Sequence, residues 1–358
     1  MSAQTDGEHN TVIGFSAFDA ADSGESNNVV IGSGAAGAMN TATCDNNVII
    51  GKDAGVGGVA TLTACVAIGA ASLTATGNIG ASDSVFIGKD SGGGSWSTAG
   101  CDNNTAVGAG TMAGAMNGAA NNVAVGKSAL AAITTGDENV AVGSNAGDGW
   151  STQSQNTVVG HHAASNSGAG NITAVGYKAL EDCSSDGAVA LGHSAGMNIT
   201  SGAGNTAVGF NSLLTTATGA KNTAIGYEAL KLAIDGGDQC TAVGYMALDA
   251  ANNQYSDKNT AVGSDALGAN TSGQQNTGLG ANTGATLTTG DACVILGENS
   301  DVSTADAQNQ IIIGQGVTGQ ANNSVTLGNA DVTAVYMASD SGAQVSCGTL
   351  GIGLAAVA

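Results

Sequence analysis

Hydrophobic and polar residues alternate in short stretches along the chain, and each stretch ends at a glycine, as in NTAIG at residues 222–226. The residue directly before this marker glycine is always Ile, Val or Leu, and the residue two positions earlier is mostly Val or Thr. An alternation with a period of two is typical of a strand with one buried face, and β-branched residues favour strands. We therefore expect a short strand before each marker glycine, with these two slots forming the core.

The stretches are copies of one repeat, whose slots are counted from the marker glycine, with slot −1 before it and slot +1 after it. Successive markers are 14 to 20 residues apart, mostly 16 to 19. This period is too short for helical repeats and fits one coil of a β-solenoid. The 19 marker glycines are Gly14, Gly32, Gly51, Gly69, Gly88, Gly108, Gly126, Gly143, Gly160, Gly176, Gly192, Gly209, Gly226, Gly244, Gly263, Gly280, Gly297, Gly314 and Gly328.

The remaining slots predict how a coil turns. Slot −2 is often Ala, which predicts a second surface that a neighbouring chain approaches closely. Slot −4 is Asn in 11 copies, and Asn tolerates left-handed backbone and bonds to other Asn side chains in a stack. We expect slot −4 and the marker glycine at corners. Slot +3 is Ala, Ser or Thr in the first 17 copies, and a frequent Leu at slot +4 predicts a second, shorter strand facing the same core.

The composition agrees with a narrow solenoid. The chain has 358 residues, with 58 Gly, no Pro and 3% aromatic residues, so bulky side chains are too scarce for a large core. All seven basic residues are lysines, and 28 acidic residues leave a net charge of −21. This charge and the lack of arginine argue against nucleic-acid binding. They favour a rod that stays soluble.

The sequence shows no signal for a membrane or for secretion. No apolar run reaches the roughly 18 to 20 residues that cross a bilayer, so no membrane insertion is expected. Residues 1–15 lack the basic and apolar regions of a signal peptide, and the first repeat begins at Asn10. The expectation is a protein made in a cytoplasm that reaches the outside without a signal peptide of its own.

The repeat resembles a known family. Its pattern Asn-Thr/Val-Ala/Val-Val/Ile-Gly, followed by x-x-Ala/Ser-Leu, is similar to the head repeats of trimeric autotransporter adhesins (YadA-like) over about residues 10–328. It is closer to the longer-period version in tail fibres of marine bacteriophages. The resemblance implies an all-β fold, a left-handed parallel β-roll of about 19 coils, with three rolls around a threefold axis. No secretion signal or C-terminal membrane anchor of the adhesins is recognised, which favours the phage assignment.

These observations divide the chain into an N-terminal lead-in at 1–9, the repeat roll at 10–328 and a C-terminal tip or trimerisation segment at 329–358. The stretch Val332–Val345 resembles the segment that often precedes a self-cleaving chaperone in phage fibres, and the sequence leaves open whether such a chaperone was cleaved off. Solenoid ends expose unpaired strand edges unless they are capped, which leaves end-to-end stacking into a filament open.

Motifs for chemistry do not stand out from the repeat. GSGAAG at Gly32–Gly37 matches the dinucleotide fingerprint, but Gly32 is an ordinary marker glycine and no amphipathic helix follows. The seven cysteines lack the two-residue spacing of zinc or redox motifs, and we expect reduced structural thiols. No set of Ser, His and Asp residues indicates an enzyme, and no catalytic residue, metal or cofactor is expected.

Aromatic residues are the candidate contacts for a host receptor or glycan. Six successive copies carry a ring at slot +1, which would form a stack along one face at the strand spacing of roughly 4.8 Å. The stack either packs, ring on ring or against a neighbouring chain, or binds sugars, or holds a titratable or catalytic group. Two tryptophans between copies are either tucked onto the roll or presented to a partner. The eight residues are His161, Tyr177, His193, Phe210, Tyr227, Tyr245, Trp96 and Trp150.

The favoured function is a structural fibre or adhesin: a homotrimeric phage tail fibre or related virion fibre that contacts the host surface. The alternatives are a bacterial cell-surface adhesin or extracellular filament subunit, and a free glycan- or ice-binding solenoid. The expected location is the virion, or the extracellular space or cell surface. An ice-binding surface needs an exposed Thr ladder, whereas the recurring Thr at slot −3 is expected to face inward.

Overall fold

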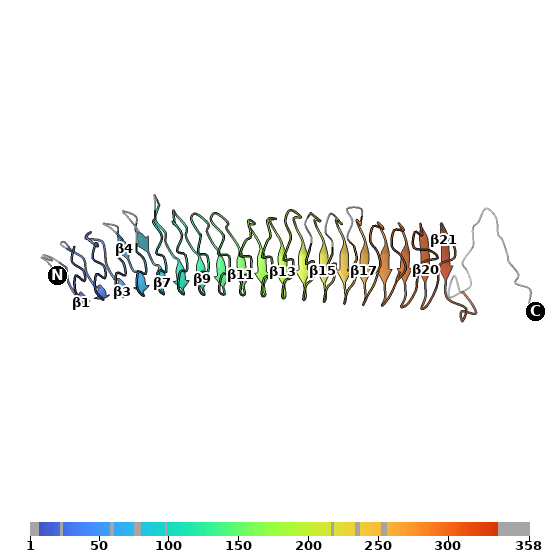
Figure 1. The fold of residues 1–358 in the computed structure, drawn as a ribbon, viewed down its shortest axis with the longest axis horizontal. Coiled ribbons are helices and arrows are strands. Elements are labelled where there is room, and N and C mark those ends of the chain that lie inside the picture. Colours follow the sequence, from blue (N-terminus) through green and yellow to red (C-terminus); the bar gives the residue numbers. More distant parts are fainter. Residues whose placement is uncertain are drawn as a thin grey trace, which may run out of the picture.

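Short parallel strands stack side by side along the whole length of a rod in the computed structural model (Figure 1). The chain forms an all-β parallel β-solenoid of about 17 turns. The structure describes residues 7–21, 24–57, 61–74, 80–96, 99–215, 218–232, 237–251 and 256–335. Most of the C-terminal segment predicted at 329–358 lies outside these residues.

The main sheet has 19 strands, and each ends one residue before a marker glycine. Its strands are β1 (Thr11–Ile13), β2 (Val29–Ile31), β3 (Val48–Ile50), β5 (Val66–Ile68), β7 (Val85–Ile87), β8 (Thr105–Val107), β9 (Val123–Val125), β10 (Val140–Val142), β11 (Thr157–Val159), β12 (Thr173–Val175), β13 (Val189–Leu191), β14 (Thr206–Val208), β15 (Thr223–Ile225), β16 (Thr241–Val243), β17 (Thr260–Val262), β18 (Thr277–Leu279), β19 (Val294–Leu296), β20 (Gln310–Ile313) and β21 (Ser324–Leu327). A small second sheet pairs β4 (Leu62–Thr63) with β6 (Ala81–Ser82).

Strands from consecutive copies pair in parallel and in register, so equal slots lie above one another. Thr223 pairs with Thr241, for example, and Ile225 pairs with Val243. Each coil therefore repeats the environment of the coil before it, and the repeat predicted from the marker glycines is confirmed as the structural unit.

The two faces of the strands are the reverse of the expected ones. From β2 to β20, the residue at slot −2 is buried, and Ala207 and Ala224 are among these residues. Slots −3 and −1 point outward, and Ile225 at slot −1 is 40% exposed. The prediction that slots −3 and −1 form the core was wrong, and the alanine face cannot meet a neighbouring chain.

Alanine is the inward residue because the coil is too narrow for two large side chains at one level. Where slot −2 holds Ala224, Leu230 at slot +4 fills the same core from the opposite wall, and both are fully buried. Where slot −2 holds Phe86, slot +4 is Gly92, and a Cβ added there would clash with the Phe86 ring. In these coils the two slots hold one large side chain between them, and where both are small, as at Ala141 and Gly147, another residue such as Trp150 fills the space, as dense packing requires.

The marker glycine turns the chain where the expected corner lies. From Gly14 to Gly314 the marker glycines have φ between +129° and +143°, a region that L side chains avoid. A Cβ added to Gly226 would also overlap the carbonyl of Gly244 in the next coil. Glycine was expected at this corner because of a positive φ or a crowded backbone, and the structure shows both.

The expected second strand is instead a left-handed turn. Slots +3 and +4 are buried against the core, as Ala229 and Leu230 show. Slots +2 and +4 are left-handed, however, with φ of 53° at Glu228 and 49° at Leu230. A backbone that alternates in this way cannot form an extended ladder, so the sequence predicted the burial of this segment but not its conformation.

Slot −4 forms a ladder of side-chain hydrogen bonds. The backbone N–H and the side-chain amide of Asn139 both donate to Oδ1 of Asn122 in the coil before, at 3.0 Å each. The stacking of Asn is therefore confirmed, but the left-handed residue is the preceding one, Glu138, with φ 59°. Cys240 replaces Asn in this slot, and its Sγ donates to the carbonyl of Ser256 at 3.0 Å.

Candidate functional site

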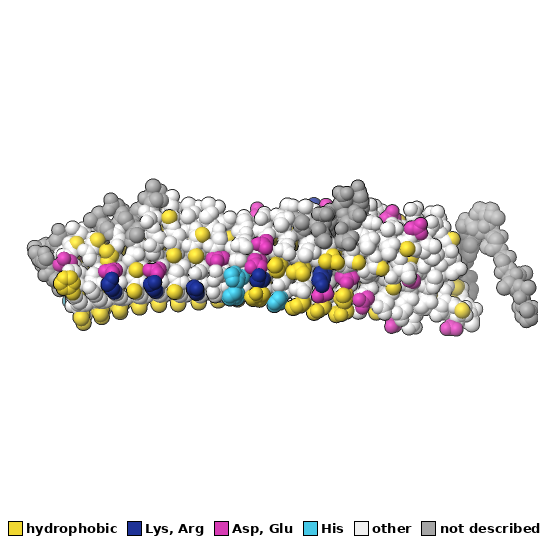
Figure 2. All heavy atoms as spheres, viewed as in Figure 1, with side chains coloured by type: hydrophobic (Ala, Val, Ile, Leu, Met, Phe, Trp, Pro, Cys, Tyr) yellow, Lys and Arg dark blue, Asp and Glu magenta, His cyan; other side chains and the backbone are white. Residues whose placement is uncertain are grey.

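The outer side of the strands forms one continuous surface, which we call the apolar strip and define as slots −3 and −1 of the 19 strands. Slot −1 is aliphatic in every strand, slot −3 is Val, Ile or Thr, and neither slot carries a charge. Leu191 is 50% exposed and Leu279 51%. Figure 2 shows hydrophobic side chains in a row along the lower edge of the rod, where the arrows of Figure 1 end.

The apolar strip changes in character along the rod. Slot −3 is mostly Val from β2 to β10, whereas from β11 to β18 it is Thr in all strands except β13. Because slot −3 faces outward, these hydroxyls line the surface rather than the core. The expectation that Thr faces inward was wrong for the same reason as the core prediction.

Next to the apolar strip lies the aromatic ladder, the six rings at slot +1 of consecutive coils. Neighbouring ring centroids are 4.9 to 5.7 Å apart, and the ring planes differ by 8° to 29°. This is the continuous stack that the sequence predicts. The rings are His161, Tyr177, His193, Phe210, Tyr227 and Tyr245.

Stacking leaves the ladder with exposed edges and covered faces. Each of the four inner rings has a neighbouring ring on both sides, and the terminal ring of His161 also lies 4.3 Å from the ring of His162 in a T-shaped contact. Tyr177, Phe210, Tyr227 and Tyr245 are nevertheless 40% to 51% exposed. Sugars commonly bind aromatic residues through the ring face, so the geometry offers a saccharide mostly edges and polar ring atoms.

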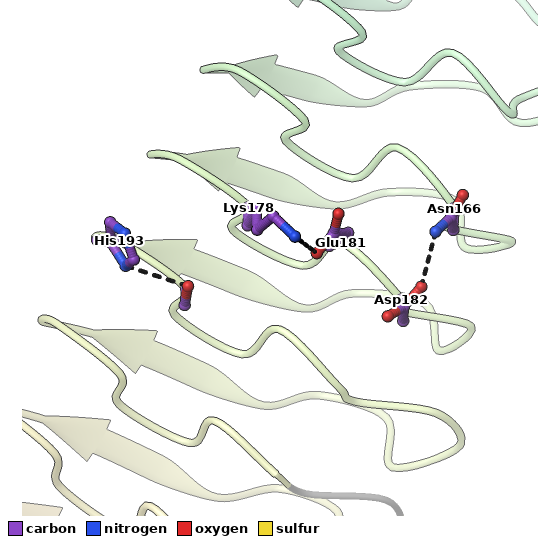
Figure 3. A network of polar contacts seen from close by, with 6 residues as sticks. Asn166, Lys178, Glu181, Asp182 and His193 are labelled. Carbon is purple, nitrogen blue, oxygen red and sulfur yellow. Dashed lines mark hydrogen bonds and ion pairs between the residues drawn. The ribbon is translucent and has the colours of Figure 1, made fainter.

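Charged side chains beside the ladder are paired within the chain (Figure 3). Lys178 Nζ lies 5.8 Å from the centre of the Tyr177 ring and 3.0 Å from a carboxylate oxygen of Glu181. The hydrogen bond to Glu181 raises the pKa of Lys178. Along the same flank, Asn166 donates to Asp182 at 2.9 Å. These contacts hold the turn that follows the ladder and place no free charge against the rings.

A catalytic arrangement is not apparent among the described residues. The ring nitrogen Nδ1 of His193 lies 3.1 Å from the hydroxyl of Ser194, but none of the contacts drawn in Figure 3 joins a carboxylate to this pair. Within the described ranges, no three His, Cys, Asp or Glu side chains gather as they would around a metal.

The two tryptophans belong to the core. Trp150 is fully buried and Trp96 is 5% exposed, with the Trp96 ring 6.0 Å from that of Phe86. The tucked arrangement is thus the one found, and neither indole offers a receptor a contact. Trp150 fills the space beside Gly147, where an added Cβ would clash with the indole.

The cysteines in the described part of the chain are buried and form no disulfide there. Burial raises the pKa of Cys65 and of Cys240 to about 11, so both thiols stay protonated at neutral pH. Cys347 lies outside the described residues. The six described thiols fit the structural role predicted for them.

No family model matches the chain, and no curated protein matches it. In the part of the chain that the structure describes, no helix is long and apolar enough to span a bilayer. The apolar strip and the aromatic ladder are therefore assigned from their own geometry. Sequence reasoning found the ladder but missed the strip, although the pairing of Ala at slot −2 with Leu at slot +4 was the signal for it.

Proposed function

We propose that the protein is a structural fibre: a homotrimeric rod of left-handed coils that belongs to a phage tail fibre or a related virion fibre and contacts the host surface. The observation that carries the proposal is the apolar strip, which runs without a charged residue along all 19 strands. A monomeric soluble protein rarely exposes so long an apolar patch, and such patches mark association sites. The resemblance of the repeat to adhesin and phage-fibre repeats supports the same conclusion.

The strip is large enough for a stable assembly. Nineteen strands at about 4.8 Å spacing, each presenting three residues of about 3.3 Å, give a surface on the order of 900 Å² on each chain. Stable interfaces bury about 800 Å² on each partner. The interface proposed here lies on slots −3 and −1, in place of the buried alanine face.

The oligomer is tested by light scattering on the full chain. We expect about three times the chain mass of 34.1 kDa, also in dilute solution, because the interface runs the length of the rod. The double variant Val125→Glu with Leu279→Glu places charges on the strip and should give a folded monomer. The matched control, Thr152→Glu with Thr289→Glu, adds the same charges in exposed loops and should remain a trimer. A monomeric wild-type chain contradicts the proposal.

A second candidate is a free solenoid that binds ice or a glycan surface, and the outward Thr ladder favours it. Thr206, Thr223, Thr241, Thr260 and Thr277 occupy slot −3 of five successive strands and form a regular outward row. The strip cannot serve both functions along the same coils, since a trimer interface covers it. If the wild-type chain is monomeric, inhibition of ice recrystallisation that is lost in Thr223→Leu with Thr241→Leu would support this candidate.

A further inference from the structure

The aromatic ladder is continuous with the apolar strip. Slot +1 follows slot −1 after a single glycine, so each ring lies two residues beyond an outward aliphatic side chain of the same coil. At these coils the aliphatic row includes Val159, Leu191 and Ile225, which are 38%, 50% and 40% exposed. Over these six coils the outward surface thus has three rows: slot −3, which is Thr in five of the six coils, the aliphatic row at slot −1, and the rings at slot +1.

The ring faces in the ladder are covered by neighbouring rings, and this limits which ligands can bind to them. Stacking and edge-to-face contacts are the strong interactions of aromatic rings. In the ladder the stacking partners are already present. The remaining edges, which carry the hydroxyls of three tyrosines and the ring nitrogens of two histidines, suit the mixed polar and apolar side chains of another chain better than a sugar that needs a face. Ring edges that lie beside an apolar strip extend that strip.

A partner that contacts all six rings must match their spacing. The rings recur once per coil, at centroid distances of 4.9 to 5.7 Å, because they follow the strand spacing of the rod. Another copy of this chain, lying parallel, presents side chains with the same axial period by construction. A partner with a different period would fall out of step within a few coils.

We propose that the aromatic ladder lies in the seam between chains of the rod and packs against a second copy, where it reinforces the middle of the interface. This inference rests on the proposed trimer, and it adds the aromatic ladder to the interface that the apolar strip forms. The ladder is then a structural contact whose loss weakens the assembly more than the single chain.

Nitration of exposed tyrosines by tetranitromethane, mapped by mass spectrometry, tests the inference on the full chain. Tyr177, Tyr227 and Tyr245 should react several-fold more slowly in the wild-type assembly than in the monomeric variant Val125→Glu with Leu279→Glu. Those two substitutions flank the ladder and leave its coils unchanged. The loop variant Thr152→Glu with Thr289→Glu should show the protection of the wild type.

The mass measured on the same samples separates the outcomes. A trimer whose ladder tyrosines react as fast as those of the monomer overturns the seam and leaves the fibre proposal intact, with the ring edges open to a receptor. A wild-type chain that is monomeric overturns the fibre proposal itself. Tyr227→Ala should also lower the melting temperature of the assembly by more than that of the monomeric variant, whereas an equal decrease in both contradicts a contact between chains.

Discussion

At the scale of single residues, slot −4 shows how one side chain serves two coils. Asn122 accepts two bonds from Asn139 through Oδ1, and its own amide donates to Oδ1 of Asn104 at 3.1 Å and to the carbonyl of Gly136 at 2.9 Å. The stack is buried, so a donor that loses its acceptor cannot form a hydrogen bond to water instead. Each such group destabilises a fold by about 1 to 3 kcal/mol.

We therefore expect Asn122→Ala to lower the free energy of unfolding by on the order of 3 kcal/mol, since two donors of Asn139 lose their acceptor. Asn122→Cys should be milder, because this slot already accepts cysteine in Cys65, Cys240 and Cys293. Urea unfolding of the two variants beside the wild type measures the difference. Equal stability of Asn122→Ala and the wild type would show that the ladder does not contribute.

The buried thiols predict how stability changes at alkaline pH. Burial raises the pKa of Cys65 and Cys240 to about 11. Below the ordinary thiol pKa of about 8.5 both thiols are protonated in the folded and in the unfolded chain, so their full contribution to the free energy of unfolding is present there. Between about pH 8.5 and 11 the unfolded chain releases these protons and the folded chain does not. Stability should fall there by on the order of 1 kcal/mol per thiol and pH unit.

The measurement is urea unfolding at intervals from pH 8 to pH 10.5. The variant Cys65→Asn with Cys240→Asn restores the common residue of the slot and should lose less stability over this range than the wild type. Curves of equal slope would assign the alkaline loss to other groups.

Much of this residue-level detail could be predicted from the sequence. The positive φ of the marker glycines and the Asn stack follow from what each residue type tolerates. The left-handed residues directly before slot −4 carried a signal as well, since that position is Asn in seven copies, among them Asn27, Asn46 and Asn103. The left-handed residues at slot +4 could not be predicted in this way. Leu130, Leu180 and Leu230 occupy this slot without any preference for such backbone, and the neighbouring coils determine the conformation.

At the scale of the strand, two adjacent residues on opposite faces test which face is buried. Ala207 is fully buried, whereas Val208 points outward at slot −1. Ala207→Asp places an unpaired charge in the core and should destabilise the chain by on the order of 3 kcal/mol or more. Val208→Asp should leave the fold of a single chain nearly unchanged and weaken the assembly instead.

Thermal unfolding and light scattering of these two variants separate the effects. If Val208→Asp unfolds the chain and Ala207→Asp does not, the assignment of the faces is wrong. The sequence alone could not decide this point, because an alternation with period two defines two faces without saying which is inside. Larger side chains usually face a core, but here Leu230 and its equivalents at slot +4 occupy the space that a large residue at slot −2 would need.

At the scale of the whole molecule, the rod should behave as a sum of coils. Deletion of Ser264–Gly280 removes 17 residues and joins Gly263 to Ala281, so the slots stay in phase. Each coil contacts only its neighbours, and we expect a folded rod that is shorter by about 4.8 Å. Small-angle scattering should give a length of roughly 90 Å for the wild type and the corresponding decrease for the variant.

Deletion of Ser264–Ser272 is the control, since it removes about half a coil. The deletion places outward and inward slots of neighbouring coils above one another, so the coils cannot pair in register. Circular dichroism should therefore report a loss of strand content. If both deletions fold equally well, the coil is not the unit of stability.

The direction of the hydrogen bonds between coils has a mechanical consequence. These bonds, such as those from Thr223 to Cys240 and from Gly226 to Val208, join each coil to the next along the rod axis. A force that pulls the two ends of one chain apart therefore loads the coils in series, and the terminal coil peels first. A coil of 17 residues that advances the rod by about 4.8 Å releases roughly 55 to 60 Å of chain when it opens. A single chain would yield stepwise at a force set by one coil, so greater length adds extensibility without adding tensile strength.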